Sequence, residues 1–155
     1  MRLIECCLIF YLTPTPQPDD GIIFMKRYLT FGFVLAGLVN IFGVLGFSLG
    51  FQNELLTSYY PQIFSHFGLG MIILWGMAYI SVSTEHPRAS RLIFVFFIEK
   101  MVYVGTAVYF WFVMKPDIAV MWNESVLTTI FLVIYGINDL LFGLMFFYAW
   151  LQYKK

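Results

Sequence analysis

Four long segments of this chain consist almost entirely of apolar residues, and they limit what it can fold into. They cover residues 29–50, 62–83, 92–114 and 125–151. A helix needs about 20 apolar residues to cross the hydrocarbon core of a bilayer. Isolated strands cannot satisfy their backbone groups in lipid, so we expect each segment to form a transmembrane helix.

The composition indicates the same class of protein. Of the 155 residues, 61% are hydrophobic and 12% are charged, whereas a soluble domain carries about 25% charged residues. One core of this size cannot hide so much apolar surface from water. Nine basic residues balance nine acidic ones, so no basic field exists to attract nucleic acid. These numbers argue against a soluble enzyme, a disordered chain and a nucleic-acid binder, and they make the lipid bilayer the expected partner.

The connections between the segments predict the topology. They are short and rich in polar residues and proline, which favours an all-α, up-down-up-down four-helix bundle. In such a bundle six basic residues share one side and only Lys115 lies on the other. Cytoplasmic loops carry the excess of Lys and Arg, so we expect both termini in the cytoplasm and a multi-pass protein of the inner (plasma) membrane. The six residues are Lys26, Arg27, Arg88, Arg91, Lys154 and Lys155.

The first 25 residues differ from the rest of the chain. Their apolar run, residues 3–12, is too short to span a bilayer, and three prolines follow it. Cys6 and Cys7 are adjacent and have no distant partner, so no disulfide framework is expected. We expect residues 1–25 to be a disordered or weakly membrane-associated leader. The alternative is that Met25 is the true start and residues 1–24 are an upstream extension. Residues 26–155 then form the membrane domain.

Small residues in the first and fourth segments predict close contacts between helices. Small side chains let helix backbones approach each other in lipid. Ordinary packing within the bundle is the expected role, and a dimer face or a gate is the alternative. The candidate packing residues are Gly32, Ala36, Gly43, Gly46, Gly50, Gly136 and Gly143.

Polar residues at one depth form the most informative pattern. A charged side chain inside lipid costs about 2.5–3.5 kcal/mol on insertion scales, so such residues are rare and often functional. Lys100 could pair with Asp139, while the partner of Glu99 could be an asparagine or its own proton. We expect Glu99 to be the protonated acid, because an isolated buried charge is usually neutralised. The layer contains Asn40, Glu99, Lys100, Asn138 and Asp139.

This layer either fixes the register of the helices or binds a proton or polar ligand. The sequence has no phosphate loop, nucleophile elbow or zinc motif, so we expect no catalytic residue, metal or cofactor, and an enzyme is the less favoured reading. His66 and His86 lie at opposite ends of the bundle and cannot chelate one ion together.

Three functions therefore stay open. The first is a non-enzymatic bundle component that self-associates or packs with a membrane partner protein. The second is a proton-coupled carrier or channel that uses Glu99, Lys100 and Asp139. The third is a quinone- or lipid-binding subunit of a membrane oxidoreductase system.

A family resemblance rests on the four segments and on two local stretches within them. The stretches are Gly37-Leu38-Val39-Asn40-Ile41-Phe42-Gly43 and Trp75-Gly76-Met77-Ala78-Tyr79. From Lys26 to Lys155 the chain resembles the small four-helix membrane proteins of the DoxX/BphX-like type. The resemblance implies a bacterial inner-membrane protein. Relatives of that type mostly lack an assigned biochemistry, and some are linked to oxidoreductase or quinone systems.

Overall fold

A computed structural model describes residues 20–154, and it is helical with no strand in that range. The predicted leader therefore lies mostly outside the described residues. The helices are α2 (Asp20–Phe47), α3 (Glu54–Tyr59), α4 (Pro61–Phe64), α5 (His66–Val82), α6 (Ser90–Tyr109), the π-helical turn η1 (Phe110–Met114), α7 (Ile118–Glu124) and α8 (Val126–Tyr153).

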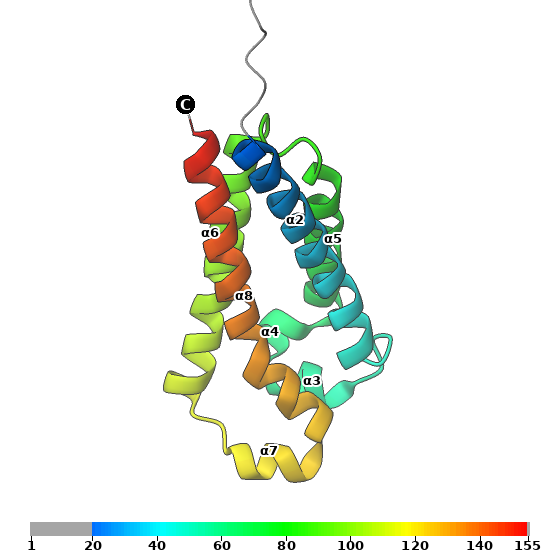
Figure 1. The fold of residues 1–155 in the computed structure, drawn as a ribbon. Helices are drawn as coiled ribbons and strands as arrows, with labels where there is room; N and C mark the ends of the chain where they lie inside the picture. Colours follow the sequence, from blue (N-terminus) through cyan, green and yellow to red (C-terminus); the bar gives the residue numbers. More distant parts are fainter. Residues whose placement is uncertain (1–19, 155) are drawn as a thin grey trace, which may run out of the picture.

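Three helices are long and apolar enough to cross a membrane. They run over Ile23–Phe47, Ser90–Met114 and Val126–Tyr153, and the shorter apolar helix α5 covers His66–Val82. The start of α2, the end of α8 and the connection from α5 to α6 lie at one end of the molecule, while α7 lies at the other end (Figure 1). The all-helical class and the membrane character that the sequence predicted are therefore supported.

The helix ends differ from the predicted segments in two places. Helix α2 begins at Asp20, inside the predicted leader, because the prolines that stop a helix all precede this residue. The predicted segment 62–83 is divided at Ser65, whose backbone is extended and whose side chain accepts a hydrogen bond from the Gly68 amide. This capping bond starts a new helix, so α5 is shorter than the sequence suggested.

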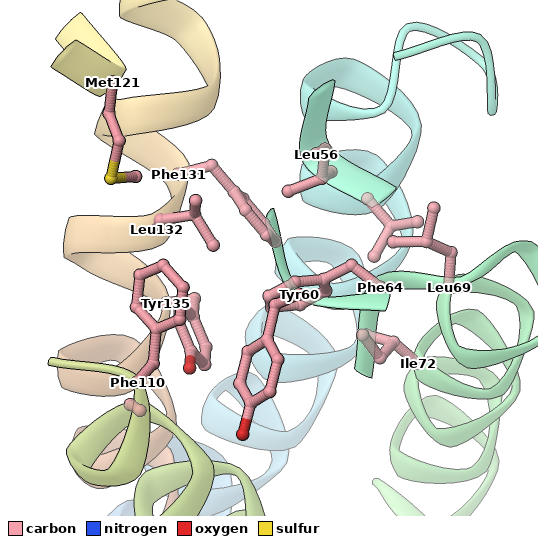
Figure 2. Packing of buried hydrophobic residues seen from close by; sticks show 12 residues of the cluster. Leu56, Tyr60, Phe64, Leu69, Ile72, Phe110, Met121, Phe131, Leu132 and Tyr135 are labelled. Carbon is pink, nitrogen blue, oxygen red and sulfur yellow. The ribbon is translucent and has the colours of Figure 1, made fainter. Parts of the chain in front are cut away.

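The long helices associate in two pairs, α2 with α5 and α6 with α8. Two apolar clusters fill the space between the pairs. The cluster near α7 is rich in aromatic rings (Figure 2) and contains Val44, Leu56, Tyr60, Phe64, Leu69, Ile72, Ala107, Phe110, Met121, Phe131, Leu132 and Tyr135. The cluster near the start of α2 and the end of α8 contains Leu29, Phe33, Ala36, Tyr79, Ile93, Phe96, Phe146 and Ala149.

The small residues predicted for packing have three kinds of environment. A β-carbon on Gly32, Gly136 or Gly143 would meet a side chain of another helix at 2.4–2.5 Å, and Ala36 is fully buried. Gly43 and Gly46 have open space where a β-carbon would be. Gly50 lies beyond the end of α2 with φ +64°, so it serves a turn that favours glycine.

The closest approach of α2 and α5 is made by two glycines that the sequence reasoning did not select for packing. A β-carbon on Gly37 would lie 2.5 Å from the carbonyl oxygen of Gly76, and one on Gly76 would lie 2.8 Å from the carbonyl oxygen of Gly37. Both contacts involve backbone atoms, which cannot move aside as a flexible side chain can. The crossing of α2 and α5 therefore requires glycine on both helices.

We expect Gly76→Ala to destabilise the protein by about 1–3 kcal/mol, because overpacking at a helix crossing forces the backbones apart. Gly70→Ala is the matched control on α5, since a β-carbon there meets nothing within 4 Å. The free energy of unfolding, measured by denaturant titration in mixed micelles, should fall for the first variant only. Equal stability of the two variants would contradict the close crossing.

Candidate functional site

The predicted polar residues lie between the two apolar clusters. Along α2, Asn40 follows Ala36 of one cluster and precedes Val44 of the other, and Asp139 on α8 lies between Tyr135 and Phe146 in the same way. Asn40, Glu99, Lys100 and Asp139 are buried, and Asn138 is half-buried. The structure therefore places all five residues at the same level of the bundle.

Lys100 is the centre of a hydrogen-bond network that joins α2, α5, α6 and α8. Its ammonium group donates to Asp139 Oδ1 at 2.5 Å and to Asn40 Oδ1 at 3.1 Å. The amide of Asn40 donates in turn to the carbonyl oxygen of Ile72, 3.2 Å away on α5. Lys100 is 1% exposed, so the ion pair with Asp139 is shielded from solvent. The pairing that the sequence allowed is thus present.

Glu99 has a different partner from the asparagines considered in the sequence analysis. The hydroxyl of Tyr79 on α5 donates to Glu99 Oε2, while the buried Oε1 has no partner among the described residues. The ring of Tyr79 also lies close to Lys100, whose Nζ is 5.3 Å from the ring centre. Tyr79 therefore contacts both buried charged residues of α6, Glu99 and Lys100. The protonation of Glu99 stays a prediction.

A cavity of about 90 Å³ lies beside the ion pair. Its lining combines a polar corner with an apolar and aromatic wall. Two of the lining residues, Val39 on α2 and Ile134 on α8, are 36% and 42% exposed, which places a mouth on the outer surface between these helices. The lining consists of Val39, Asn40, Gly43, Val44, Phe47, Phe64, Ile72, Lys100, Tyr103, Phe131, Ile134, Tyr135, Asn138 and Asp139.

Tyr135 adds a polar group to this cavity that the sequence reasoning missed. The residue lines the cavity and is 5% exposed, and its buried hydroxyl makes no hydrogen bond of normal geometry in the described part of the chain, with the side chain of Thr106 as a polar neighbour. In Figure 2 the hydroxyls of Tyr60 and Tyr135 both point away from Met121 and the α7 end. Tyr135 precedes Asp139 by one helical turn, and this spacing was the available signal because residues four apart share a helix face.

His86 is buried at the end of the bundle where α2 begins and α8 ends. Its ring stacks on Phe33 at 5.5 Å and lies 5.3 Å from the ring of Tyr153. Its Nε2 is 3.1 Å from the Thr30 hydroxyl and 3.3 Å from the carbonyl oxygen of Lys26. The residue is therefore a packing element at this end of the bundle.

His66 lies near the other end and is exposed, with Nε2 3.0 Å from the carbonyl oxygen of Phe51. Within residues 20–154 no group of three or more His, Cys, Asp or Glu side chains could hold a metal ion. Within the described part of the chain, the cavity beside Lys100 and Asp139 is the best candidate for a ligand-binding site.

The comparisons with known proteins add no relative. No family model matches the chain, and neither does any curated protein or solved structure. The resemblance to DoxX/BphX-like proteins therefore stays a prediction, and the geometry of the site carries the functional argument.

We expect removal of one partner of the ion pair to be more harmful than removal of both. Lys100→Met leaves Asp139 as an unpaired buried charge, which typically costs about 3–5 kcal/mol, whereas replacing both partners with apolar residues is often neutral. The free energy of unfolding should therefore fall for Lys100→Met and for Asp139→Leu and recover in the double variant. Additive losses in the double variant would show that the two residues do not interact.

Burial lowers the pKa of His86 below its ordinary value of 6.5, with a smaller lowering by the charge of Lys26 opposed by the hydrogen bond to the Lys26 carbonyl. The unfolded chain then binds a proton at a higher pH than the folded chain does. We expect the contribution of His86 to stability to be complete above pH 6.5 and to decrease as the pH falls below it.

The stability of the wild type between pH 7 and pH 5 should therefore fall more steeply than that of His86→Gln, as measured by thermal unfolding in detergent. His66→Gln is the control, because that ring is exposed, and it should keep the wild-type slope. Identical slopes for all three proteins would refute the buried, neutral state of His86.

Proposed function

We propose that this chain is a four-span integral membrane protein with both termini in the cytoplasm. The three long apolar helices support this, and α5, with 17 residues, is about 25 Å long at 1.5 Å per residue. That length is at the lower limit for a span. The basic residues support the orientation. Lys26 and Arg27 lie near the start of α2, and Arg88 and Arg91 lie where α5 connects to α6. These segments are at the same end of the molecule (Figure 1).

Within this bundle, the proposed function is to bind a small lipid-soluble molecule at the polar layer. The observation that carries the proposal is the cavity beside Lys100 and Asp139, which joins a polar corner to a wall of aromatic rings. Ligand sites are typically apolar hollows with a few polar groups that fix the orientation of the ligand. This arrangement favours the third function in the sequence analysis, a quinone- or lipid-binding membrane component, over the first.

The position of the mouth supports a ligand that arrives through the membrane. The lining residues at the mouth, Val39 on α2 and Ile134 on α8, are apolar and exposed, and Leu35 and Leu141 are exposed on the same faces of these helices. In a bilayer these side chains face acyl chains. A molecule that partitions into lipid would therefore reach the cavity between α2 and α8 without crossing an aqueous loop.

The proton-carrier alternative has weaker support. A carrier would use Glu99, Lys100 and Asp139 along one path, but Glu99 lies outside the cavity lining and contacts Tyr79 instead. The structural alternative accounts for the ion pair and the asparagine, because such a network can fix helix register. This structural alternative does not explain why the network borders a cavity that the Tyr135 side chain also lines.

Filling the cavity tests the proposed function. Gly43 lines the cavity and has open space at its β-carbon position, so Gly43→Leu should occupy the hollow and leave the ion pair intact. Gly46→Leu is the matched control on α2, with open space but outside the cavity lining. Native mass spectrometry of proteins purified in lipid nanodiscs from the expressing membrane should detect a small bound molecule on the wild type and on Gly46→Leu.

The same molecule should be missing from Gly43→Leu. Helicity and thermal stability measured on the three proteins show whether the variants fold. A bound molecule of equal occupancy on all three folded proteins, or on none of them, would overturn the proposed site.

A further inference from the structure

The polar corner of the cavity has a specific pattern of donors and acceptors. Two of the three ammonium hydrogens of Lys100 are used by Asp139 and Asn40, and the Tyr79 ring lies on a further side of this group. Asp139 uses Oδ1 for the ion pair. The corner therefore offers a ligand the second carboxylate oxygen of Asp139, the amide of Asn138 and the hydroxyl of Tyr135.

The charge of this corner is balanced. Lys100 and Asp139 neutralise each other, and both line the cavity. A carboxylate ligand would face the negative charge of Asp139, and an ammonium ligand would compete with Lys100 for it. An additional charge in this buried place would have no partner, which is strongly unfavourable. The cavity therefore favours an uncharged ligand.

The spacing of Tyr135 and Asp139 selects the polar group of that ligand. The two residues are one turn apart on the same face of α8, and both line the cavity, so one ligand group in the cavity can lie near both. A hydroxyl group between them can donate its hydrogen to the Asp139 carboxylate and accept one from Tyr135. A carbonyl or ether oxygen can only accept, and it would leave the carboxylate oxygen without a donor.

The walls select the body of the ligand. Phe47, Phe64, Tyr103 and Phe131 line the hollow, and their faces suit a ring. We propose that the cavity binds a neutral, ring-containing, lipid-soluble molecule through a hydroxyl group held between Asp139 and Tyr135, with the rest of its body directed to the mouth between α2 and α8. This inference rests on the proposed function, because it names the ligand class of the same site.

Four fluorinated probes that share one aromatic ring and differ in its substituent test the proposal on the full chain in lipid nanodiscs. They are 4-fluorophenol, 4-fluoroanisole, fluorobenzene and 4-fluorobenzoate. The fluorine resonance of a probe in the cavity differs from that of a probe dissolved in lipid, and only the former saturates with concentration. The Gly43→Leu variant gives the lipid background, since its cavity is filled.

We expect 4-fluorophenol to bind at least tenfold more tightly than 4-fluoroanisole and fluorobenzene, because a hydrogen bond to a charged group is stronger than one between neutral groups. 4-Fluorobenzoate should give no saturable resonance. Tyr135→Phe keeps the ring and removes only the hydroxyl, so it should weaken the binding of 4-fluorophenol and leave that of fluorobenzene unchanged. Tyr103→Phe is the control for loss of a tyrosine hydroxyl from the lining.

The possible results separate this inference from the proposed function. Equal binding of the phenol, the anisole and fluorobenzene, lost in Gly43→Leu, would overturn the hydroxyl specificity and retain the cavity as a ligand site. Saturable binding of 4-fluorobenzoate would overturn the preference for a neutral ligand. No saturable resonance for any probe would overturn both proposals. The comparison of probes on the wild type stands even when a variant fails to fold.

Discussion

The ion pair between Lys100 and Asp139 is the interaction on which the interior of this protein depends. Two charges in an apolar core are tolerated only when they satisfy each other and their remaining hydrogen-bond capacity. Here Asn40 accepts a hydrogen bond from the Lys100 ammonium group and donates one to the backbone carbonyl of Ile72. The network therefore joins α2, α5, α6 and α8. The network divides the core into two apolar clusters, one toward each end of the bundle.

The hollow beside this network follows from how the helix pairs pack. Gly37 and Gly76 bring α2 against α5, while Gly136 and Gly143 bring α8 against α6. Contacts between α2 and α8 are fewer. Near the start of α2 and the end of α8, Phe33 and Phe146 fill the space between those two helices, with ring centres 4.9 Å apart. At the level of Gly43 no side chain fills the space between α2 and α8. This space is the cavity, and its polar corner lies at the ion pair.

The sequence predicted the all-helical class and the common level of the interior polar residues, and the physical causes of both are local. Hydropathy over about 20 residues identifies a membrane-spanning helix without any tertiary information. The depth of Asn40, Lys100 and Asp139 follows from counting residues along each helix. The roles of Tyr79 and Tyr135 could not be predicted in this way, because tyrosine is common in membrane helices. Only the neighbouring side chains show whether a tyrosine hydroxyl has a hydrogen-bond partner. The break at Ser65 was missed because one serine in an apolar run does not reveal whether it caps a helix.

The sequence by itself determined that this chain forms apolar helices and that its few interior charges share one level. Both properties depend on residue type and on spacing along a single helix. Only the tertiary structure decided that Glu99 faces Tyr79, that Gly37 meets Gly76, that His86 is buried, and that a hollow borders the ion pair. Each of these depends on the rotation of one helix relative to another, which is set by the fit of many side chains at once.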